Sequence, residues 1–143
     1  MRLPVFDTRL RWLVIAYGLV MLAWMSTEAN DIRLVTLLGC IGAVLIAVLQ
    51  VTQRVGGQIL SRRAWIFGAA WIGALIGAGV SLLTAAFMFT KTAWHSHLFP
   101  DYPVEMMIAV LLRAPVWALA GAMLLLAGAL LLIIWHPQQR HSN

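Results

Sequence analysis

The chain has 143 residues, of which 62% are hydrophobic and only 10% are charged, and its formal net charge is +5. A soluble domain carries about a quarter charged residues, so this composition excludes an ordinary soluble globular protein. The mean hydropathy of +0.89 indicates a membrane protein. The basic residues stand in short segments beside apolar runs and form no basic face, so we expect them to meet anionic lipid and not nucleic acid.

Four long apolar runs follow one another, and none of the five acidic residues lies inside a run. About 20 apolar residues are enough for a helix to cross the hydrocarbon core. Barrel strands would alternate apolar and polar residues, whereas these runs are apolar all round. We therefore predict an all-α fold with one integral membrane domain, a four-helix transmembrane bundle whose spans are approximately 11–29, 32–51, 64–90 and 112–135.

The first run, Trp12 to Met25 and extendable to about Ala29, is the shortest, and its flanks resemble a secretory signal. A basic segment precedes it, and Thr27-Glu28-Ala29 loosely imitates a small-residue cleavage site. Asp7 in the basic segment, the bulky Glu28 in the site and the next apolar run, which begins at once, argue against cleavage. We predict a retained first span.

The second run, 32–51, begins after Asn30 and Asp31, either of which is suited to cap a helix N-terminus. It contains Cys40, the only cysteine, which cannot form an intramolecular disulfide and is expected to be a small buried hydrophobe. Gly56-Gly57, between two basic clusters, predicts a turn before the third run.

The third run, 64–90, carries a ridge of small residues at a spacing of four positions, which places them on one helix face. The members of this small-residue ridge are Ala69, Gly73, Gly77, Ser81 and Ala85. In lipid, burial of apolar surface gives no net driving force for the association of helices. Small residues, which let two helix backbones approach closely, therefore favour helix packing. We predict that the ridge packs inside the bundle, with contact to another protein or a second copy as the alternative.

The connection after the third run contains the only cluster of side chains that resembles a site: His95, His97, Asp101 and Tyr102. His95, His97 and Asp101 are weak candidates for ligands of a divalent metal, because imidazole and carboxylate are suitable donors. The pair of histidines lacks a third ligand at a diagnostic spacing. A solvated interfacial loop is therefore preferred, with a docking surface for a partner as a second alternative.

The fourth run is too long for one modestly tilted span, and Arg113-Ala114-Pro115 offers a break. We predict that a short interfacial helix over 104–113 precedes the span, with Pro115 in its first turn, where the missing N–H costs little. Arg113 would then lie at the outer interface near Trp117. The alternative is an intramembrane arginine that binds an anionic group.

The topology follows from the distribution of Lys and Arg. Seven of the ten fall in the N-terminal segment, the middle loop and the C-terminal tail, while the opposite side has three of them and four of the five acids. The positive-inside rule then predicts that both termini are cytoplasmic, in the inner membrane of a bacterium.

No catalytic motif occurs in the spans, which contain neither a carboxylate nor a histidine at mid-depth. We therefore expect no enzyme activity and no cofactor. The favoured function is an accessory, assembly or structural subunit of a larger membrane complex, with other membrane subunits or a second copy as partners. The alternatives are an oligomeric transporter or channel component, supported by Thr36, Ser81 and Thr84 in the spans, and a metal-binding or sensor protein that uses the loop from His95 to Asp101.

Overall fold

The computed structural model describes residues 8–58, 61–95 and 100–135, and every regular element in these ranges is an α-helix. The helices are α1 (Thr8–Met25), α2 (Ile32–Val55), α3 (Arg62–His95), α4 (Val104–Leu112) and α5 (Ala114–Trp135). Among the described residues, four segments are long and apolar enough to cross a membrane: α1, α2, α3 and the stretch Val104–Trp135 that α4 and α5 share. The prediction of an all-α protein with four such segments is confirmed for this part of the chain.

The helix ends depart from the apolar runs where side chains supply hydrogen bonds. α1 ends at Met25, earlier than predicted, because the hydroxyls of Ser26 and Thr27 donate to the carbonyls of Leu22 (3.0 Å) and Trp24 (2.7 Å). α3 extends beyond its apolar run at both ends, since a helix can continue into polar residues that meet water or headgroups. At the start of α2, the predicted cap is confirmed for Asp31, whose carboxylate accepts the backbone N–H of Arg33 at 2.8 Å.

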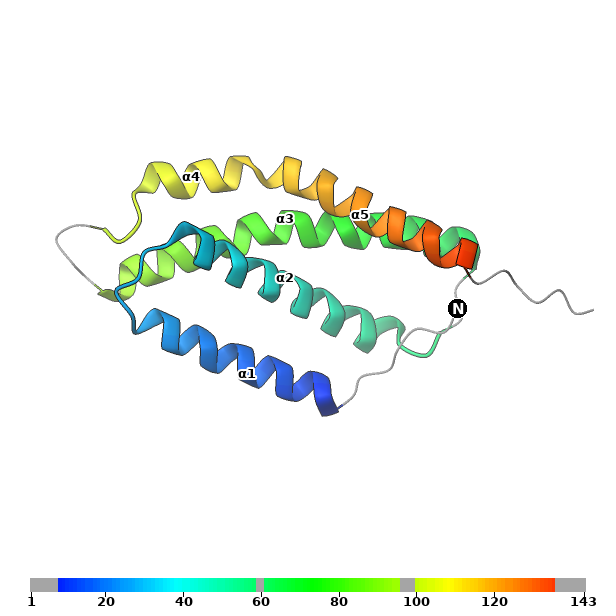
Figure 1. Cartoon of the computed structure of the whole chain (residues 1–143), viewed down its shortest axis with the longest axis horizontal. Coiled ribbons are helices and arrows are strands. Elements are labelled where there is room, and N and C mark those ends of the chain that lie inside the picture. Colours follow the sequence, from blue (N-terminus) through cyan, green and yellow to red (C-terminus); the bar gives the residue numbers. More distant parts are fainter. Residues whose placement is uncertain (1–7, 59–60, 96–99, 136–143) are drawn as a thin grey trace, which may run out of the picture.

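The helices form an open row (Figure 1). α1 packs against α2, α2 against α3, and α3 against both α4 and α5, whereas α1 and α5 do not pack against each other. The predicted four-helix bundle is therefore not closed into a ring. α3 makes the most extensive contacts with other helices, and α1 makes the fewest.

Buried apolar side chains gather at one end of the helices, where α1 and α3 end and α2 and α4 begin. We call it the Lys91 end. Its core consists of Trp24, Val35, Leu38, Met88, Tyr102 and Met107, and so includes residues of α1, α2, α3, α4 and the segment before α4. At the opposite end α2 and α3 are joined through a turn in which Gly57 has a φ of 80°, a backbone conformation that favours glycine. The helices are thus tied together most firmly at the Lys91 end.

The small-residue ridge of α3 lies where α3 and α5 approach most closely. A Cβ atom placed on Gly77 would overlap the backbone carbonyl of Trp117, and one placed on Gly73 would overlap that of Gly121. Ser81 and Ala85 are buried farther along the same face, and Ala69 is half-buried. The glycines of the ridge therefore face a helix of the same chain.

One hydrogen bond joins the middle of α1 to the first half of α2. The hydroxyl of Tyr17 donates to the backbone carbonyl of Leu38 at 2.8 Å. The ring is accommodated by Gly42, where a Cβ would lie 2.6 Å from the Tyr17 hydroxyl. This contact is one of the few that attach α1 to the rest of the chain.

We expect Tyr17→Phe to lower the free energy of unfolding by about 1 kcal/mol, because the lost hydrogen bond leaves the ring otherwise in place. Tyr102→Phe is the matched control, because the buried Tyr102 hydroxyl has no hydrogen-bond partner among the residues that the structure describes, so its removal should cost little. SDS titration of the two purified variants, followed by circular dichroism, measures the difference. Equal stability of the two variants would contradict the assigned role of Tyr17.

Candidate functional site

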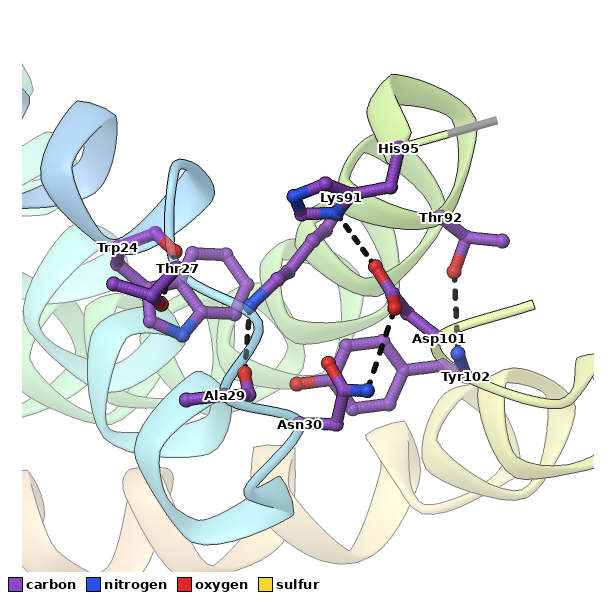
Figure 2. A network of polar contacts seen from close by, with 9 residues as sticks. All are labelled: Trp24, Thr27, Ala29, Asn30, Lys91, Thr92, His95, Asp101 and Tyr102. Atoms are coloured by element: carbon purple, nitrogen blue, oxygen red, sulfur yellow. Dashed lines mark hydrogen bonds and ion pairs between the residues drawn. The ribbon is translucent and has the colours of Figure 1, made fainter. Parts of the chain in front are cut away.

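A buried lysine lies at the centre of the Lys91 end (Figure 2). Lys91, the only lysine of the chain, stands near the end of α3 with a side chain that is 0% exposed. Its ammonium donates to the backbone carbonyl of Ala29 at 2.6 Å and lies 4.4 Å from the centroid of the Trp24 ring. An ammonium over an indole face is a favourable cation–π contact, especially when water is excluded. Lys91 thus fastens α3 to the end of α1 and to the loop that follows.

Asp101 is the second polar centre, and its two carboxylate oxygens have different partners. One accepts from the side-chain amide of Asn30 at 3.3 Å, and the other lies 2.7 Å from Nδ1 of His95. Both members of the His95–Asp101 pair are largely buried, with side-chain exposures of 15% and 10%. Asp101 therefore links the α1–α2 loop to the end of α3, and it lies within electrostatic reach of Lys91.

Tyr102 packs beneath this network with its side chain 1% exposed. Its backbone N–H donates to the hydroxyl of Thr92 at 3.3 Å, which fixes the chain just before α4 begins (Figure 2). Burial raises the pKa of Tyr102 to about 12, and the nearby carboxylates of Asp101 and Asp31 contribute to the same shift. The phenol is therefore neutral at physiological pH and acts here as an apolar anchor.

Three of the four loop residues that the sequence indicates as a candidate site make contacts at the Lys91 end. His95, Asp101 and Tyr102 join the network at the Lys91 end, and His97 lies outside the described residues. A histidine paired with a carboxylate is suited to orient an imidazole as a base or as a metal ligand. Within the described ranges, no group of three His, Cys, Asp or Glu side chains could bind a metal ion. Metal binding at this loop stays a prediction.

A second group of polar side chains lines a cleft of about 390 Å³ between α2, α3 and the junction of α4 with α5. We call it the arginine cleft. Its lining residues are Ile32, Arg33, Thr36, Val80, Ser81, Thr84, Val110, Arg113 and Trp117. It brings together two arginines that are 80 residues apart in the sequence, with hydroxyl groups between apolar walls.

The break predicted near Arg113 is present, because α4 ends at Leu112 and α5 begins at Ala114. α4 packs along α3 (Figure 1), and the position of α4 and Arg113 at the outer interface stays a prediction. Arg113 lines the same cleft as Ser81, ten residues before Lys91 in α3. At a rise of 1.5 Å per residue, Ser81 lies about 15 Å from Lys91 along the axis of α3.

Sequence reasoning missed the two residues at the centre of the Lys91 end. From the sequence, Lys91 counts only as one of the three basic residues on the side opposite the termini, and Trp24 only as one residue of the first apolar run. The available signal was the sole lysine of the chain, placed just inside the end of a helix that begins with Arg62-Arg63. Its partners could not be read from the sequence, because Ala29 contributes a backbone carbonyl and Trp24 belongs to another helix.

No protein-family model, curated protein or solved structure matches this chain. Its own residues therefore carry the functional assignment. In the described part of the chain, the network at the Lys91 end and the arginine cleft are the two places where polar side chains gather between the helices.

Proposed function

We propose that this protein is an accessory or assembly subunit of a larger membrane complex, without catalytic machinery of its own. The ionisable groups at the Lys91 end support this role, since Lys91, His95 and Asp101 make contacts that fasten helices together. The Lys91 ammonium, enclosed between the Ala29 carbonyl and the Trp24 ring, is poorly suited to bind substrate.

The observation that carries the proposal is the weak attachment of α1. Trp24 is its one buried residue, and of the other described helices it packs chiefly against α2. Along the rest of α1, many large apolar side chains are exposed, among them that of Leu19, which is 63% exposed. Helices associate in lipid through close packing, so a span with so few contacts inside its own chain is suited to pack against a span of another subunit.

Site-specific photocrosslinking at native expression tests this role. A photoreactive residue at Leu19 should join the chain to one membrane polypeptide of reproducible mass, because α1 is the proposed contact helix. A probe at Leu112, an exposed position of α4, is the matched control and should yield mainly lipid adducts. Lipid adducts alone at Leu19, as at Leu112, would contradict the accessory role.

The proposed location is the cytoplasmic membrane of a bacterium, with both termini in the cytoplasm. Its support is the seven-to-three division of Lys and Arg between the two sides of the four spans. Reporter fusions after Gly57 and after Asn143 should report a cytoplasmic position, and a fusion after Pro100 an external one. An external signal at Gly57 would reverse the topology.

An oligomeric transporter or channel component is the second candidate, and the arginine cleft favours it. Ionisable side chains within spans commonly mark the paths of ions and substrates. Uptake of a labelled anion into vesicles that contain the purified protein would support this candidate, provided that Arg113→Gln abolishes it.

A further inference from the structure

The arginine cleft has an excess of positive charge. Arg33 and Arg113 both line it, no lining residue is acidic, and neither guanidinium makes an ion pair or hydrogen bond with another described residue. The nearby carboxylate of Asp31 accepts the backbone N–H of Arg33 and does not line the cleft. Both arginines are exposed at the edges of the cleft, and a cation among membrane spans is costly without a counter-charge, so an anion is the expected occupant.

Two buried hydroxyl groups in the wall of the cleft also lack partners. Ser81 and Thr84 are each 1% exposed, and neither hydroxyl oxygen has a hydrogen-bond partner among the described residues. Thr36 differs, because its hydroxyl already donates to the carbonyl of Ile32 at 2.7 Å. Buried hydroxyls are rarely left unpaired, since the lost hydration is not recovered. Both oxygens are closed off from the cleft space, and Thr84 Oγ1 lies against Gly39 of α2, so they make the wall more polar without contacting an occupant.

The two arginines lie at different depths. Gly39 of α2 lies against Val80 and Thr84 of α3, and Arg33 precedes Gly39 by six residues, about 9 Å closer to the Lys91 end. Arg113 lies deeper, beside Ser81. The cleft therefore extends along the helices from near the Lys91 end toward the middle of α3.

We propose that the arginine cleft binds an anionic phospholipid of the leaflet at the Lys91 end. Arg33 and Arg113 donate to its phosphate oxygens, because a guanidinium matches phosphate in charge and in the geometry of its N–H groups. The apolar wall of Ile32, Val80, Val110 and Trp117 receives the start of an acyl chain. A free phosphate ion would share the polar contacts but would leave this wall uncovered. Lipid binding here does not depend on the accessory role.

Native mass spectrometry of the purified, delipidated protein tests the assignment. The parent protein is incubated with phosphatidylglycerol and phosphatidylcholine in equal amounts. We expect one phosphatidylglycerol retained per chain and little phosphatidylcholine, because the cleft has two cations and no anion to pair with choline. This selectivity is measured on the parent protein, so it does not depend on whether a variant folds. Equal retention of the two lipids would overturn the proposal.

Variants locate the bound lipid. Arg33→Gln and Arg113→Gln should each weaken phosphatidylglycerol binding about tenfold, the loss of one charge-assisted hydrogen bond. Arg113→Lys keeps the charge and should retain part of the affinity. Arg63→Gln is the control, because Arg63 is exposed at the other end of α3. An equal effect of the Arg63 change, or no effect of the cleft variants, would show that the lipid binds elsewhere and would overturn the proposal.

A parallel titration distinguishes the two sources of phosphate. Inorganic phosphate at millimolar concentration should leave the bound phosphatidylglycerol in place, because the ion cannot cover the apolar wall. If inorganic phosphate displaces the lipid fully and binds only when Arg113 is present, the site is one for a free anion and the lipid assignment is wrong.

Discussion

Gly77→Leu should be among the most destabilising single changes in this protein. A Cβ at position 77 would overlap the backbone carbonyl of Trp117 and lie 2.9 Å from the Cα of Ala118, so α3 and α5 must separate to admit a leucine. Backbone atoms cannot move aside as a flexible side chain can. We expect the free energy of unfolding to fall by about 3 kcal/mol, the upper part of the usual range for overpacked contacts. SDS titration followed by circular dichroism measures it.

Gly68→Leu is the matched control for this experiment. Gly68 lies in the same helix, and a Cβ placed there has no atom within 4 Å. The control should be neutral or slightly stabilising, because leucine favours a helix over glycine by up to about 1 kcal/mol. If both variants unfold at the same SDS fraction, the close approach of α3 and α5 at Gly77 is wrong.

Lys91→Met should have the second large effect, because it removes the buried cation of the Lys91 end while keeping an unbranched side chain of similar size. The change deletes the hydrogen bond to Ala29 and the contact with the Trp24 ring. A lost charged hydrogen bond together with a lost buried cation–π contact should lower the free energy of unfolding by about 2–3 kcal/mol. Arg63→Met, at an exposed position of the same helix, should change it by less than about 0.5 kcal/mol.

A double-mutant cycle separates the contact with Trp24 from the other effects of the lysine. The stabilities of Lys91→Met, Trp24→Leu and the double variant should be non-additive by about 1 kcal/mol, because each single change removes the same contact. The double variant should lose less unfolding free energy than the sum of the losses in the two single variants. Strict additivity would mean that ammonium and indole do not interact, and the Lys91 end would then need another explanation.

The sequence by itself determined the elements whose causes are local. Four apolar runs of sufficient length marked the membrane-crossing segments, because the free energy of transfer into lipid depends on composition along one helix. Asp31 was recognised as a helix cap, and the break at Arg113 followed from the length of the fourth run and from Pro115. Each of these features depends on residues within a few positions of one another.

The tertiary structure alone decided which faces meet. Small residues at a spacing of four marked a packing face on α3, but the partner helix, and the role of Gly121 in it, came from the approach of α5. The row arrangement, the burial of Lys91 against Trp24 and the meeting of Arg33 with Arg113 in one cleft likewise depend on contacts between distant segments. The physical reason is that lipid solvates every apolar face equally well, so hydropathy places a helix in the membrane but does not choose its neighbours.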